Sequence, residues 1–394
     1  MVPARVRDID LPPFDPLNVR AARLRAAGHH VISLGQALPF FDPPASALAA
    51  ARAALDTGEA NLYVTDPGLP ALRTALADRL RGLRITASAD DIIITAGANH
   101  AFTLACMTLV NAGDEVVLPA PYFTNHQMAV AALGAVPVEA PIADRETFGV
   151  RWTDIEPLLS GRTRAVVLCS PSNPTGAVLD AAEGRRIVSE LASRGVVVLS
   201  DETYLHFVYG RPHWSVASSP DWRRNVVVVG TFSKSFGMMG WRVGFMLADA
   251  GVCAQAVKIQ DAMIICAPSI GQSAALAAVR EDWDYPQSFH PELLQRRSAL
   301  LEGIRGVPRL HWRPTSGAFF GFVRVHGCTD SAALAESLLD EAHVVTIPGS
   351  AFGASGEGHL RLSYGSAGVS DVTEATRRIA AYFSSRAREA TRAV

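Results

Sequence analysis

The stretch at residues 225–244, NVVVVGTFSKSFGMMGWRVG, joins a run of four valines to a polar turn that carries Lys234. Of the 36 lysines and arginines in the chain, only Lys234 and Lys258 are lysines. Arginine stays protonated, whereas a lysine amine can be desolvated, deprotonated and bonded to a carbonyl carbon. Lys234 is therefore a candidate covalent residue, although a GC-rich coding sequence would give the same arginine bias without a catalytic role.

Composition narrows the class of protein. A chain of 394 residues is long enough for two or three domains. The formal net charge of −2 gives no sign of nucleic-acid binding. Five widely spaced cysteines without a CxxC pair predict reduced thiols and no metal site. No apolar leader and no uncharged apolar run of roughly 18 residues is present. We therefore expect a soluble, cytoplasmic protein that acts on small molecules and does not bind membranes.

From residue 91 onward the pattern strand, polar turn and helix repeats. The predicted strands are 91–95, 115–119, 136–140, 165–169, 196–200, 225–230 and 243–248. Continuous β-branched runs of this kind are buried on both faces, which is typical of a mainly parallel sheet between two layers of helices. The pattern predicts an α/β fold with a seven-stranded sheet.

The two ends of the chain look different. Residues 1–18 are rich in proline and predict an extended arm. After a helical region at 291–306, shorter strands at 319–325, 344–349 and 359–365 mix with helices. We therefore predict three segments: an arm with part of a small domain at 1–50, a large domain at 51–285, and a smaller α+β domain at 286–394.

Chemically useful groups follow five of the predicted strands, and ligands of open parallel sheets bind beyond those carboxyl ends. The groups are Gly97, Ala98 and Asn99 in a small-residue turn; Phe123; Asn173; Asp201 with Tyr204; and Thr231 with Lys234. Taken singly, Asn173 is a turn residue, Asp201 a helix cap and Phe123 a core residue. Neither a P-loop nor an SxxK motif fits around the lysine. Together they offer the anion site, flat face, amide, carboxylate, phenol and amine that pyridoxal phosphate requires.

The motifs SLGQALPFFDPP, NLYVTDPGLPALR, TAGANHAF, PYF, SPSNPTG, SDETY, TFSKSFGMMGWRVG and HLRLSYG extend this pattern from about Ser33 to Tyr364. With them the chain resembles the fold-type I pyridoxal-phosphate enzymes, specifically the class I/II aminotransferases of the aspartate aminotransferase family. The resemblance implies a transferase-like large domain, pyridoxal 5′-phosphate as cofactor, and a homodimer with shared active sites.

The resemblance also implies residue roles. Lys234 matches the Schiff-base lysine that forms the internal aldimine and then carries the proton between Cα and the cofactor. Asp201 matches the partner of the pyridinium nitrogen. The other matches are Asn173 and Tyr204 as donors to the phenolate; Gly97, Ala98, Asn99, Thr231 and Arg242 around the phosphate; Phe123 as stacking ring, where many members have tryptophan; Tyr63 reaching the neighbouring subunit's phosphate; and Arg361 and Gly35 at the substrate.

Three functions remain open at this point. The first is a ping-pong aminotransferase acting on an L-α-amino acid and a 2-oxo acid. The alternative is a lyase or synthase that uses the same cofactor for β-elimination or replacement, and a third is a cofactor-free binding protein. A dicarboxylate substrate needs a further cation that no motif places, which favours substrates with neutral or aromatic side chains.

The alternation of Leu360 and Leu362 with polar residues predicts one core face and one polar face for the strand that carries Arg361.

Overall fold

The computed structural model describes residues 2–392, and its largest element is a seven-stranded sheet with the order β2-β8-β7-β6-β5-β3-β4. Its strands are β2 (Ile92–Thr95), β3 (Glu115–Ala120), β4 (Val136–Pro141), β5 (Thr163–Cys169), β6 (Val197–Asp201), β7 (Val226–Thr231) and β8 (Gly244–Leu247). All neighbours pair in parallel except β8, which runs antiparallel to both β2 and β7. The predicted α/β class with a mainly parallel seven-stranded sheet is confirmed.

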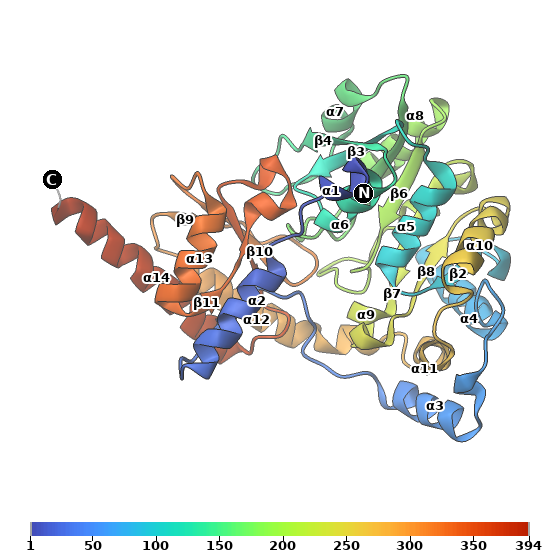
Figure 1. Ribbon diagram of the computed structural model, residues 1–394, viewed down its shortest axis with the longest axis horizontal. Helices are drawn as coiled ribbons and strands as arrows, with labels where there is room; N and C mark the ends of the chain where they lie inside the picture. Colours follow the sequence, from blue (N-terminus) through green and yellow to red (C-terminus); the bar gives the residue numbers. More distant parts are fainter. Residues whose placement is uncertain (1, 393–394) are drawn as a thin grey trace.

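Helices cover both faces of this sheet because its strands are apolar on both sides (Figure 1). Val226 and Val228 pack with α4 (Pro70–Leu80), α8 (Ala181–Ser193) and α11 (Ser269–Glu281) on one face. Val227 and Val229 point to the opposite face and pack with α5 (Ala98–Leu109), α6 (Thr124–Ala132) and α10 (Ala250–Ile264). The valine run is thus buried on both faces, as successive side chains in a strand point to opposite faces.

A second, smaller core lies beside the large sheet. Its four-stranded antiparallel sheet has the order β12-β13-β10-β9. The strands are β9 (Leu310–His311), β10 (Phe320–Val325), β12 (Ile347–Pro348) and β13 (His359–Ser363), packed with α12 (His290–Ile304), α13 (Ser331–Ala342) and α14 (Val369–Arg392). The amino-terminal strand β1 (Ile32–Ser33) pairs in parallel with β11 (Val344–Val345), so both ends of the chain meet in this core.

The amino-terminal arm is not extended throughout, which corrects the sequence-based expectation. Residues Ala4–Arg7 form a helical turn, α1, and α2 (Phe14–Ala26) begins inside the proline-rich segment. Arg5 donates to the carbonyl oxygen of Ala132 on α6, whereas α2 lies against the small core, so the arm spans both parts of the molecule (Figure 1). Pro13 and Pro16 flank or enter the first turn of α2, where a missing N–H costs nothing.

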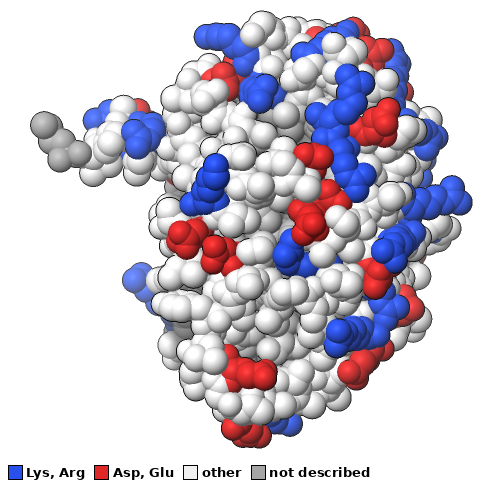
Figure 2. Space-filling view, turned by 90° about the vertical axis from the view of Figure 1, so that its right-hand side faces the viewer, with Lys and Arg blue, Asp and Glu red and all other residues white. Residues whose placement is uncertain are grey.

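Two surface properties bear on function. On the face drawn in Figure 2, basic and acidic side chains are interspersed over a largely uncharged surface. Within residues 2–392, no helix is both long and apolar enough to cross a membrane.

Candidate active site

A cavity of about 400 Å³ lies at the carboxyl ends of the parallel strands and is partly closed by the amino-terminal segment. Ten of the residues singled out from the sequence line it: Ala98, Asn99, Phe123, Asn173, Asp201, Tyr204, Thr231, Lys234, Arg242 and Arg361. The first nine lie at the ends of strands of the large sheet or in the connections between them, and Arg361 comes from β13 of the smaller sheet. The cavity is of the size that small-molecule sites usually have.

Lys234 lies on α9 (Phe232–Ser235), a single helical turn that starts directly after β7. Thr231 caps this turn, because its hydroxyl accepts a hydrogen bond from the backbone N–H of Ser233 at 3.1 Å. The Lys234 amine donates to the carbonyl oxygen of Ala37 at 2.8 Å. Burial, followed by the positive charges of Arg361 and Arg242, lowers the pKa of Lys234 to about 8. The amine is therefore easier to deprotonate than an ordinary lysine.

Asp201 ends β6 and is buried on the floor of the cavity. His126 Nε2 lies 3.0 Å from Asp201 Oδ2, and the N–H of Thr203 donates to Oδ1 at 2.9 Å. Burial acts to raise the pKa of Asp201, but the hydrogen bond and charge of His126 together with the hydrogen bonds of Thr203 outweigh it, so the pKa lies below its ordinary value. The site thus holds an ionised carboxylate away from water, ready for a cationic N–H group.

The corner of the cavity formed by Gly97 and Arg242 has the features of an anion-binding site. Gly97 precedes α5, whose amino terminus faces the cavity at Ala98 and Asn99, and helix amino termini attract negative charge. Arg242 donates to the carbonyl oxygen of Met239 at 2.8 Å and of Ala96 at 3.2 Å, which fixes its fork beside this turn. Gly97 has a φ of +88°, and a Cβ there would lie 2.4 Å from Arg242 Nη2. Only glycine allows this close approach.

Arg361 is fully enclosed, with 2% of its surface exposed. It donates to Asn173 Oδ1 at 2.9 Å and to the carbonyl oxygen of Gly35 at 2.5 Å, while its Nε has no partner within the described residues. The rings of Phe14, Phe320 and Phe352 surround the guanidinium at 5.1–5.5 Å. The polar face of this strand is therefore buried at the site, and an Arg in this setting suits a carboxylate.

The other predicted residues take different positions. Burial raises the pKa of Tyr204, whose phenol stays protonated as a donor in the cavity. The ring of Phe123 stands edge-on to His126 with centroids 5.3 Å apart. Gly97 and Gly35 do not line the cavity themselves but contact Arg242 and Arg361. Tyr63 is far more exposed, at 77%, and lines a separate groove of about 550 Å³.

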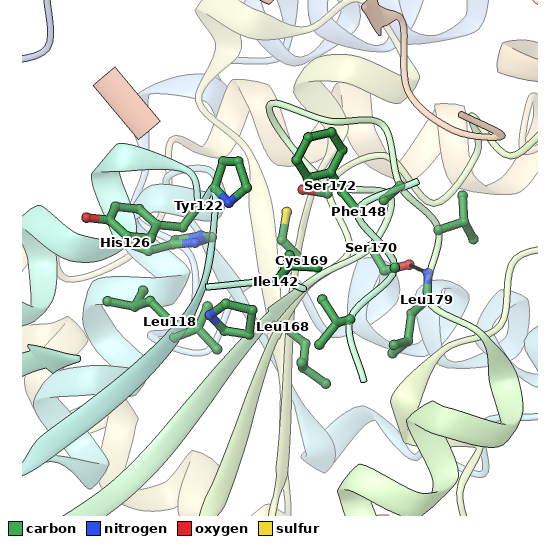
Figure 3. Close-up of a pocket in the computed structure, with 17 residues that line it drawn as sticks. Leu118, Tyr122, His126, Ile142, Phe148, Leu168, Cys169, Ser170, Ser172 and Leu179 are labelled. Carbon is green, nitrogen blue, oxygen red and sulfur yellow. Dashed lines mark hydrogen bonds between the residues drawn. The ribbon is translucent and has the colours of Figure 1, made fainter. Parts of the chain in front are cut away.

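Sequence reasoning missed His126, Cys169 and the start of α2. His126 lies one helical turn after Phe123 at the amino end of α6, so an i, i+3 reading after the strand would have found it. Cys169 lines the main cavity and also a small enclosed cavity of about 30 Å³ behind it. Figure 3 shows Cys169 in the centre of this small cavity, with Tyr122 and His126 on one side and Ser170 on the other. The space holds about one water molecule.

Comparison with known proteins identifies the family of the chain. The family described as aminotransferase class I and II matches residues 29–379. Aspartate aminotransferase of Pyrococcus abyssi is 35% identical over 363 residues, which cover 90% of this chain and 92% of that protein. A probable aspartate/prephenate aminotransferase of Aquifex aeolicus is 32% identical over 92% of this chain and 93% of its own. The crystal structure of an aromatic aminotransferase from Pyrococcus horikoshii OT3 has a TM-score of 0.86 at 34% identity, covering 94% of this chain and 99% of that one.

Fold and comparisons together define an aminotransferase. The chain belongs to the aminotransferase class I and II family, whose members are pyridoxal-phosphate enzymes. The residues present fit that cofactor: an amine of lowered pKa, an ionised buried carboxylate, and an arginine against a helix amino terminus share one cavity of suitable size. The close approach of Gly97 to Arg242 leaves backbone N–H groups and the guanidinium at the same corner for the phosphate.

Proposed function

We propose that this enzyme transfers an amino group between an L-α-amino acid and a 2-oxo acid by a ping-pong reaction, with Lys234 covalently attached to the cofactor between turnovers. The observation that carries the proposal is the position of Lys234, an amine of pKa about 8 that shares its cavity with Asp201 and Arg361. Relatives named for aspartate, prephenate and aromatic substrates support transamination as the reaction.

Each residue has a separate task in this proposal. Arg361 binds the α-carboxylate of the substrate and so places its Cα beside Lys234. With the cofactor bound, the amine of Lys234 would take the proton from the substrate's Cα and carry it towards the cofactor, a general-base role that its lowered pKa favours. Pyridoxal phosphate supplies the electron sink for the broken Cα–H bond, and Asp201 faces its ring nitrogen.

The remaining residues hold and orient. Arg242, Thr231 and the turn formed by Gly97, Ala98 and Asn99 hold the phosphate. Phe123 would stack on the cofactor ring, and Asn173 and Tyr204 would donate to its phenolate oxygen. Gly35 contributes its carbonyl to the hydrogen bond that fixes Arg361 at the substrate.

We further propose that the enzyme is a cytosolic homodimer with shared active sites. Tyr63 and Leu62, exposed at 77% and 67%, line the groove between α3 (Ala45–Asp56) and α11 and suit a second copy of the chain. Mixing Tyr63→Ala with Lys234→Ala chains tests the shared site. Hybrid dimers then contain one site with both residues, so activity above that of either parent is expected. No recovery in verified hybrids contradicts the shared site.

The covalent role of Lys234 is tested by borohydride reduction of the holoenzyme followed by peptide mass spectrometry. The chain has only two lysines, so Lys258→Ala is the matched control: it lies on the surface and donates to Gln255. We expect cofactor mass on Lys234 alone, and loss of the visible absorbance in Lys234→Ala only. Transamination itself predicts a stable aminated cofactor after amino-acid addition, reversed by a 2-oxo acid. Ammonia release without that form would indicate elimination instead.

A further inference from the structure

The helical turn that carries Lys234 contacts a buried histidine that no role above uses. Ser235 ends this turn, α9, directly after Lys234, and its side chain is buried. Its Oγ lies 2.7 Å from Nδ1 of His206, which is also buried. Neither Ser235 nor His206 lines the main cavity. The contact therefore supports Lys234 from outside the cavity wall.

α9 has only four residues, and helix nucleation is too costly for so short a helix to be stable alone. The Thr231 hydroxyl caps its start. The backbone N–H of Phe236 donates to the carbonyl oxygen of Phe232 at 2.9 Å and closes the single turn. Ser235 supplies the side-chain hydrogen bond at the other end. The direction of the Lys234 side chain thus depends on Ser235 as well as on the cap.

The same contact links two strand ends of the site. His206 lies in the turn after β6, the strand that ends at Asp201. Asp201 and Tyr204 line the cavity from this turn, whereas His206 faces Ser235 on α9. The hydrogen bond therefore ties the turn after Asp201 to the turn that carries Lys234, the carboxylate and the amine of the site.

His206 is itself held in place. His290 Nε2, at the start of α12, donates to the carbonyl oxygen of His206 at 2.7 Å. The ring of Trp283 stands edge-on to the imidazole, with centroids 4.6 Å apart. Burial, followed by the charges of His213 and His290, lowers the pKa of His206 to about 3. The imidazole is therefore an uncharged partner of Ser235 throughout the pH range in which Lys234 titrates.

Glu202 anchors the same turn on another side. This buried carboxylate accepts hydrogen bonds from the hydroxyl of Ser215 at 2.9 Å, the hydroxyl of Ser200 at 3.2 Å and the N–H of Val216 at 3.2 Å. Its Oε2 also lies 2.8 Å from Nε2 of His213. With so many partners the turn has little freedom to move, so it provides a fixed support for α9.

His206 also has a simpler explanation, as a ring that fills the core. Its edge contacts with Trp283 and Phe236 account for an aromatic side chain, but a phenylalanine would make them as well. They do not account for a nitrogen that faces Ser235. Because Nε2 has no partner within the described residues, Ser235 is the only hydrogen-bond partner of the imidazole there.

Resting on the proposed role of Lys234, we propose that His206 is a positioning residue, which through its hydrogen bond to Ser235 holds the end of α9 so that the Lys234 amine stays aligned with Asp201. Loss of this bond displaces the amine while Arg361 keeps its place. Displacement of a reacting group lowers kcat, here by about tenfold, whereas KM for the amino acid changes less than about twofold.

The test compares His206→Leu with His206→Asn. The two new side chains are similar in size, and both lose the ring contact with Trp283, but only the amide of asparagine can bond to Ser235. Ser235→Ala removes the same bond and leaves the ring contacts of His206 in place. This variant keeps the test decisive if a change at His206 prevents folding.

Two readouts are used. The first is competitive acetylation of the cofactor-free protein over a range of pH, followed by peptide mass spectrometry. It gives the pKa of the Lys234 amine with Lys258, the one other lysine of the chain, as internal reference. The second is kcat and KM of the holoenzyme for an amino acid that the wild type accepts.

We expect His206→Leu and Ser235→Ala to raise the pKa of Lys234 from about 8 towards its ordinary value of 10.5, because the amine leaves its buried place near Arg361 and Arg242. Both variants should lower kcat by about tenfold, and combining them should cost no more than either alone. His206→Asn should stay close to the wild type in both readouts.

Equal losses in His206→Leu and His206→Asn would show that the ring only packs, which overturns the proposal. A wild-type pKa of Lys234 and a wild-type kcat in Ser235→Ala overturn it as well. If reduction of the holoenzyme leaves no cofactor on Lys234, the proposed function fails. The acetylation of the cofactor-free protein still decides whether His206 positions the amine.

Discussion

The imidazole Nε2 of His126 lies 3.0 Å from Asp201 Oδ2, and both side chains are buried beneath the cavity. Burial acts to raise the pKa of Asp201, but this contact, together with the hydrogen bonds of Thr203, keeps that pKa below its ordinary value. Folding stability from Asp201 is therefore present above its unfolded pKa and is lost as the pH falls through its lower folded pKa. The same ionised form is the one that attracts a cationic ring nitrogen.

His126→Leu should shift the acid limb of cofactor binding to higher pH. Without the imidazole, the burial of Asp201 is no longer offset, so its pKa rises. A rise of about one unit weakens cofactor binding about tenfold at a pH below the new value. Cofactor dissociation constants between pH 4.5 and 8 measure this effect. His126→Asn keeps a hydrogen-bond donor, so its pH profile should lie between those of the wild type and His126→Leu. Superimposable pH profiles of the wild type and His126→Leu would contradict the role of His126.

Lys234→Met should stabilise the cofactor-free protein near neutral pH. The wild-type pKa of about 8 lies below the ordinary value of 10.5, so the unfolded chain binds more protons between these values. The free energy of unfolding of the wild type therefore rises with pH across that window, and that of the variant does not. We expect a difference of about 1–2 kcal/mol at pH 7 that closes towards pH 10. Urea unfolding at several pH values measures it.

The control for this titration is Lys258→Met, since Lys258 is exposed and its amine donates to Gln255. Its unfolding free energy should follow the wild-type curve. A wild-type stability that stays flat between pH 8 and 10 would show that Lys234 titrates normally.

Gly97→Ala should weaken cofactor binding far more than Gly113→Ala. Both glycines have positive φ, +88° and +85°, so an added Cβ costs about 1 kcal/mol of stability at either position. At Gly97 the Cβ would also meet Arg242 Nη2 at 2.4 Å, while nothing lies within 4 Å at Gly113. Cofactor affinity and urea unfolding are measured together. Equal losses of affinity would mean that the phosphate does not bind at this corner.

Arg361→Lys should lower kcat/KM for amino acids about 100-fold, because an ammonium cannot replace a fork that donates to Asn173 and Gly35 and still reaches a carboxylate. Cofactor affinity should change little. The exposed Arg324→Lys serves as control and should leave both quantities unchanged. If Arg361→Lys loses cofactor affinity while its kcat/KM for amino acids is retained, Arg361 binds the cofactor and not the substrate.

Much of the large domain could be predicted because its valine and isoleucine runs are buried on both faces, a pattern that leaves little choice of structure. The antiparallel direction of β8 was not predictable, because a short buried apolar strand has the same sequence pattern in either direction. The helical turn α1 escaped prediction because it has no buried residues and hence no hydrophobic pattern. The sequence predicted one strand at 344–349, but the structure has two short strands, β11 and β12, separated by Thr346. β11 pairs with β1 and β12 pairs with β13, so the two strands belong to different sheets.

The site was predictable where strand ends collect polar groups, and less so elsewhere. Lys234 and Asp201 follow strands of one sheet, so their convergence follows from topology. Arg361 belongs to the smaller sheet, and its burial depends on rings from Phe14 and Phe352 that only the tertiary fold brings together. The roles of these residues stay predictions until the variants above are measured.

The pairing of β2 with β8 also has a consequence for biosynthesis. Ile92 leaves the ribosome long before its partner Leu247, so the edge of the large sheet and the corner between Gly97 and Arg242 stay incomplete until β8 has been translated. Arg361 follows later still, near the end of the chain. The residues proposed to hold the cofactor are thus translated before Arg361, which is proposed to bind the substrate, and a product terminated between them would contain the first group without the second.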